Sequence, residues 1–146
     1  MGIAVLTDAF ETELLKASIT TLASAPLTSA ILALYANNVV LARTTVKADL
    51  TLANFDGYSQ FTLGSWRQPY TDLAGDIVIS PSVPATFSCT GQGTINTVYG
   101  AAVLDSTGAT LLAAQEFDTP ITPITGQAWQ ITPELSVTGS LNACEC

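Results

Sequence analysis

The sequence predicts a mainly β protein, built as a single antiparallel β-sandwich or jelly-roll-like domain with one N-terminal α-helix. From about residue 29 onward, short segments rich in Val, Ile, Thr, Tyr and Phe follow one another, and Gly, Pro, Asn and Asp separate them. Such spacing is typical of sandwiches and jelly rolls. No repeat or linker divides the 146 residues, of which 48% are apolar, so one folded domain is expected.

The first expected element is an amphipathic helix over about Ala9–Leu22. Asp8 followed by Glu11 has the form of a capping box, and apolar residues then recur near helical spacing. The helix should end before Ala25-Pro26, because a residue that precedes proline is pushed out of the α region. We therefore expect an N-terminal helical element at 1–28, a β-sandwich domain at 29–140 and a C-terminal tail at 141–146.

Strands are expected through the rest of the chain. The predicted strands are Ser29–Tyr35, Phe55–Leu63, Asp76–Ser80, Ala85–Thr90, Thr97–Leu104, Thr110–Phe117 and Gln127–Val137. In addition, Leu50–Asn54 is expected to form a helical turn before its strand.

The stretch VYGAAVLDSTGATLLAAQEFD (98–118) predicts a β-hairpin. Asp105-Ser-Thr-Gly108 suits a type I turn followed by a left-handed residue. The preceding strand is apolar on both faces, which predicts that it is covered on both sides. Gly100 and Ala102 are small enough to let another element approach closely, either the N-terminal helix or a neighbouring subunit.

Catalysis is not expected. Asp105-Ser-Thr-Gly108 is close in spelling to an aspartic protease half-site, but its glycine comes one residue too late and no second copy supplies the partner carboxylate. The chain contains no histidine, which excludes the common Ser-His and Cys-His pairs and leaves Cys89, Cys144 and Cys146 without the partners of a zinc site. We assign no catalytic, cofactor-binding or metal-binding residues.

Charge narrows the class of partner. The net charge is −8, and the four basic residues form no run, so neither nucleic acid nor an anionic membrane surface is an expected partner. No apolar run is long enough for a transmembrane helix, and the N-terminus does not read as a secretion signal, so we expect synthesis in a cytoplasm.

The aromatic residues allow two interpretations. Tyr58, Trp66, Tyr70 and Trp129 could form a stacking platform for sugars, or could pack in the core; the core interpretation is favoured. The loop that contains Trp66, Arg67 and Tyr70 is the best candidate for contacting a partner.

The order LYANN, ADLTLANFDGY, GSW and VYGAAVLDSTGATLLAAQEFD, from about Leu34 to Val137, resembles a group of small bacteriophage virion structural proteins. The resemblance implies a non-enzymatic virion component with a compact β fold. A capsid decoration (cement) protein is favoured, bound to the major capsid protein as a homo-oligomer, with a trimer preferred. The alternatives are a tail or fibre protein, or a carbohydrate-binding module that contacts a host glycan.

Overall fold

The computed structural model describes residues 5–7, 29–67, 70–71, 73 and 77–137. Within these ranges the protein is mainly β, and every strand pair is antiparallel, which confirms the predicted class. The predicted helix at Ala9–Leu22 and the predicted tail at 141–146 lie outside the described residues.

The strands form three sheets. The largest has the order β1–β8–β7–β2–β3, made by Val5–Leu6 (β1), Leu111–Ile121 (β8), Val98–Leu104 (β7), Ile31–Tyr35 (β2) and Phe61–Thr62 (β3). A second has the order β10–β5–β4, made by Leu135–Val137 (β10), Ile77–Ile79 (β5) and Tyr70–Thr71 (β4). Ala85–Ser88 (β6) pairs with Ala128–Ile131 (β9).

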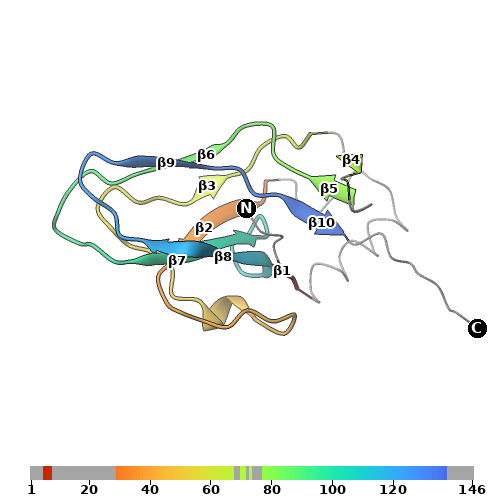
Figure 1. Cartoon of the computed structure of the whole chain (residues 1–146), viewed down its shortest axis with the longest axis horizontal. Coiled ribbons are helices and arrows are strands. Elements are labelled where there is room, and N and C mark those ends of the chain that lie inside the picture. The colour runs from red at the N-terminus through yellow and green to blue at the C-terminus, as the bar shows by residue number, and fades with distance from the viewer. Residues whose placement is uncertain (1–4, 8–28, 68–69, 72, 74–76, 138–146) are drawn as a thin grey trace, which may run out of the picture.

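The five-stranded sheet separates two buried clusters. On one face, Leu32 and Val103 pack with Phe87 of β6 and Leu135 of β10. The β6–β9 pair runs across from the sheet on that side, and the two layers are visible edge-on in Figure 1. On the other face, Tyr35 packs with residues of the connection that follows β2. The central strands are therefore buried on both sides, as predicted for 98–104.

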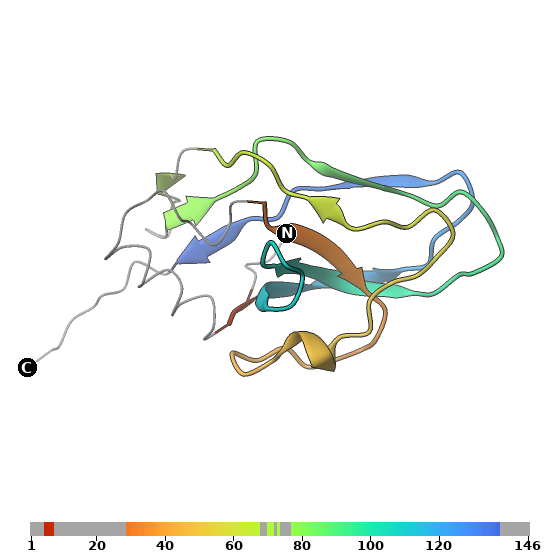
Figure 2. The same ribbon diagram turned by 180° about the vertical axis from the view of Figure 1, so that it is seen from behind.

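The connection 36–54 covers that second face. It carries the short 3-10 turn η2 (Lys47–Asp49), drawn in gold on the opposite side of the sheet from β6 and β9 in both views (Figures 1 and 2). The helical turn predicted at Leu50–Asn54 is wrong. That segment is extended instead, because Ala53 N donates to Leu34 O (2.8 Å) and Leu52 bridges Tyr35 on β2.

The strand predicted at Phe55–Leu63 is shorter than expected, since only Phe61–Thr62 pairs with β2. A turn interrupts it: Tyr58 N donates to Phe55 O (2.9 Å), and Gly57 has a φ of 86° that favours glycine.

The strand predicted at Gln127–Val137 is two strands, β9 and β10. Pro133 lies between them and cannot donate to a ladder, and the two halves pair with different partners, β6 and β5. The strand predicted at Thr110–Phe117 continues to Ile121. Two strands of two residues each, β1 and β4, had no prediction because they are too short to show alternation.

Candidate interaction surface

The turn between β7 and β8 uses the Asp105 carboxylate as a structural acceptor. Its oxygens accept hydrogen bonds from Ala109 N (2.9 Å), Thr110 N (3.1 Å) and Thr107 Oγ1 (2.9 Å), while Gly108 adopts a φ of 70°. Partial burial acts to raise the pKa of Asp105, but these hydrogen bonds outweigh it and hold the pKa below its usual value. The carboxylate therefore stabilises the turn, in agreement with the hairpin prediction.

A second carboxylate, Asp56, ties two loops together and was not singled out from the sequence. It accepts hydrogen bonds from Gly93 N (2.7 Å) and Thr94 N (3.1 Å). A side chain at Gly91 or Gly93 would collide with its carboxylate, so both glycines are needed for this close approach. Like Asp105, Asp56 is occupied by backbone amides.

The described carboxylates and Cys89 do not converge. Within the described ranges, no three His, Cys, Asp or Glu residues lie where they could hold a metal ion. Cys89 is buried as a free thiol, 3.3 Å from the carbonyl oxygen of Gly91.

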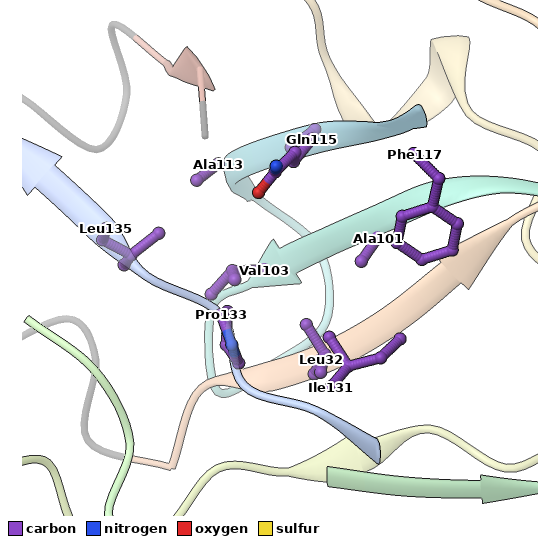
Figure 3. Close-up of a pocket in the computed structure, with 10 residues that line it drawn as sticks. Leu32, Ala101, Val103, Ala113, Gln115, Phe117, Ile131, Pro133 and Leu135 are labelled. Atoms are coloured by element: carbon purple, nitrogen blue, oxygen red, sulfur yellow. The ribbon is translucent and has the colours of Figure 1, made fainter. Parts of the chain in front are cut away.

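An apolar cavity lies between the five-stranded sheet and the β9–β10 connection (Figure 3). Phe117 and Gln115 of β8 face Ile131 and Pro133 across it. Its volume is about 20 Å³, room for about one water molecule, so it holds no small-molecule substrate.

Gly100 and Ala102, predicted to leave room for a neighbour, are both buried within this chain. Gly100 lies directly opposite Tyr35, and a Cβ at position 100 would collide with the phenol of Tyr35 and with the carbonyl oxygen of Gln115. The neighbour of Gly100 is thus the ring of Tyr35. Burial, with the Glu116 charge as a lesser cause, raises the pKa of Tyr35 to about 12, and its buried hydroxyl has no hydrogen-bond partner in the described part of the chain.

The four aromatic residues considered as a sugar platform are divided between core and surface. Phe55 contacts Tyr58 (5.2 Å between ring centroids) and Trp129 (5.8 Å) inside the protein. The hydroxyl of Tyr58 accepts a hydrogen bond from Leu34 N (2.9 Å), which satisfies the edge of β2. The core interpretation of Trp129 is confirmed.

The remaining predicted contact residues lie around β4. Trp66 is partly buried against the core and bridges Pro81, Arg67 is exposed, and 48% of Tyr70 is exposed. Of the three, Arg67 and Tyr70 are accessible to a partner.

Two open grooves flank β1, and sequence reasoning missed both. One, of about 390 Å³, lies beside Thr7 and is lined by 43–47 and 109–111. The other, of about 340 Å³, lies beside Val5 and is lined by 38–41 with Gln115, Glu116 and Asp118. The first contains the basic residues Arg43 and Lys47, and the second contains two acids.

Comparison with known protein families, curated proteins and solved structures finds no match for this chain. Within the described ranges, no helix is long and apolar enough to cross a membrane.

Proposed function

We propose that this chain is a non-enzymatic structural protein of a bacteriophage virion, a capsid decoration protein that binds the major capsid protein as a homo-oligomer. One observation carries the proposal. The large hollows on the described surface are open grooves along a sheet edge, lined by apolar and charged side chains. Open grooves that combine exposed valines with charged side chains suit another protein chain, whereas small-molecule sites are clefts or cavities that enclose most of the ligand's surface.

The carboxylates support a structural role. Asp56 and Asp105 are both tied to backbone amides in turns, where they hold loops rather than face a cavity. The sequence resemblance to small virion proteins points the same way. A decoration protein has to be rigid and resistant to unfolding, and hydrogen-bonded turns on an antiparallel scaffold provide that rigidity.

We further infer that the two layers form a β-sandwich. The buried cluster between them takes side chains from β2 and β7 on one side and from β6 and β10 on the other, which is the packing expected of a sandwich core. The jelly-roll connectivity and the N-terminal helix stay predictions.

The test is to locate and count copies of this chain in purified particles of the encoding phage. Decoration predicts hundreds of copies arrayed on the shell, and it predicts that the purified protein co-sediments with expanded shells. A handful of copies at the vertex or tail tip, together with no binding to shells, would refute it.

A tail or fibre protein, or a carbohydrate-binding module, is the second candidate, and one observation favours it: Arg67 and the half-exposed Tyr70 are available for stacking and hydrogen bonding to a sugar. A glycan array would show hits that vanish on Tyr70→Ala. The matched control is Tyr99→Ala, since Tyr99 packs against the other face of the sheet. Trp66→Ala is less specific because Trp66 also contacts the core.

A further inference from the structure

Charges of opposite sign lie at the two ends of one sheet edge. β1 pairs with β8 only at Ala113 and Ala114. The basic groove lies beyond one end of β1, at Thr110 and Leu111, and the acidic groove lies beyond the other end, at 115–118. From residue 110 to residue 118 the extended chain covers roughly 26 Å at about 3.3 Å per residue, so the two groups of charges are well separated.

The loop beside this edge also exposes two valines. Val40 is 90% exposed and Val46 is 54% exposed, and both line the grooves, one in each. In the described part of the chain, no strand pairs with the outer side of β8 beyond Ala114. A strand edge that is unpaired within the described residues is a template for pairing with another chain, and exposed valines beside it add apolar surface to that site.

We propose that this edge binds the same edge of a second copy of the chain, across a two-fold axis beside β1. In a two-fold interface residue i meets residue j and residue j meets residue i. Antiparallel alignment of the two edges therefore places the acidic groove of each copy, with Glu116 and Asp118, against the basic groove of the other, with Arg43 and Lys47. The inference rests on the proposed homo-oligomeric function and identifies the surface that forms the oligomer.

The charge pattern indicates that the partner at this edge is a second copy of the chain. A parallel alignment would place like charges against each other. A head-to-tail ring would also match every groove, but each of its interfaces would contain one charged contact, because the two grooves of a chain would meet different neighbours. The two-fold alignment matches both ends at once, which gives a dimer rather than the trimer expected from the sequence. The valines supply apolar burial, and the charges select the register, because exposed ion pairs contribute little affinity but penalise wrong alignments.

Arg43 also interacts within its own chain, so Lys47 is the more direct partner for the acids. The pairing requires only that positive charge lines one groove and negative charge the other.

The experiment is a charge exchange followed by sedimentation velocity over a dilution series. One variant carries Arg43→Glu and Lys47→Glu, and the other carries Glu116→Lys and Asp118→Lys. The control variant, Glu134→Lys, reverses an exposed charge away from this edge. Circular dichroism verifies that each variant is folded.

The wild type should sediment as a dimer of the 15.2 kDa chain, more weakly at high salt. Each edge variant should dissociate with a Kd raised at least about 10-fold. An equal mixture of the two edge variants should recover the dimer, and the Glu134→Lys control should behave as wild type. If a charge-reversed variant does not fold, the uncharged double variant Lys47→Gln and Glu116→Gln replaces it. Its dimerisation should no longer depend on the salt concentration.

A wild-type monomer or trimer, unchanged association of the edge variants, or a mixture that stays monomeric would overturn the pairing. Binding to expanded shells tests the proposed decoration function independently of the dimer. If the variants bind expanded shells like the wild type while the pairing fails, decoration stands without this interface. If the wild type forms the dimer but binds no shell, the pairing stands and decoration fails.

Discussion

The two halves of β8 differ although they form one strand. Leu111–Ala114 is buried, with β7 on one side and β1 at 113–114 on the other. The half from Gln115 to Ile121 is half-buried or exposed, has β7 on one side only within the described part of the chain, and carries Glu116 and Asp118. The difference teaches that one strand can complete the core at one end and present an edge for association at the other.

The largest effect is expected at Gly100 of β7, which pairs with Glu116 in the outer half of β8. Gly100→Val should destabilise the protein by about 3 kcal/mol or more, because the new side chain would collide with the Tyr35 ring and the β8 backbone. Denaturant unfolding of both proteins measures this loss in the free energy of unfolding. Gly64→Val is the control, since no atom lies within 4 Å of a Cβ built there. If the Gly100 variant is as stable as the wild type, β2 and β7 do not pair with Tyr35 opposite Gly100.

The turn that joins β7 to β8 should give the next largest effect. Asp105→Ala removes the acceptor of several hydrogen bonds and should cost about 1–2 kcal/mol near neutral pH. Because the folded-state pKa is lowered, this contribution is fully present above the ordinary carboxyl pKa and is lost as the pH falls through the folded value.

The measurement for Asp105 is unfolding free energy against pH for the wild type and Asp105→Asn. The difference between them should shrink as the pH falls below about 4. A difference that is constant across the acid range would show that the carboxylate charge does not contribute to the turn.

Tyr35→Phe should have a smaller effect, of the opposite sign. It removes a buried hydroxyl that has no partner in the described part of the chain while keeping the ring that fills the space above Gly100. We expect the stability to stay the same or to rise by up to about 1 kcal/mol. A loss of more than that in thermal or denaturant unfolding would mean that the hydroxyl is hydrogen-bonded in solution.

The smallest effect on folding is expected in the outer half of β8. Glu116→Lys with Asp118→Lys should change the unfolding free energy of the monomer by less than about 0.5 kcal/mol, since both side chains are exposed. Unfolding at a concentration below the dissociation constant of the dimer measures this. A large loss there would place these acids in the fold rather than on a binding edge.

The sequence predicted the local features well. The hairpin turn at Asp105–Gly108 and the doubly buried strand at 98–104 follow from turn chemistry and from apolar residues on both faces. The break at Pro133 was missed, although proline is a local signal, because the flanking residues read as one continuous strand.

The features that depend on distant pairing were out of reach. Nothing local places Tyr35 opposite Gly100, so the room above that glycine could be assigned to a helix or to a subunit equally well. Likewise, residues 38–47 line grooves with 110–118 only because of the sheet register and the path of the connection after β2. Charges that are scattered in the sequence become two groups of opposite sign only in the fold.

The most direct test of the contrast between the two halves of β8 is hydrogen exchange of its amides at low and at high protein concentration. The account predicts that amides of 111–114 are protected at both concentrations. Those amides of 115–121 that point away from β7 should exchange quickly at low concentration and become protected at high concentration. Exchange of these outward amides that is independent of concentration would contradict it.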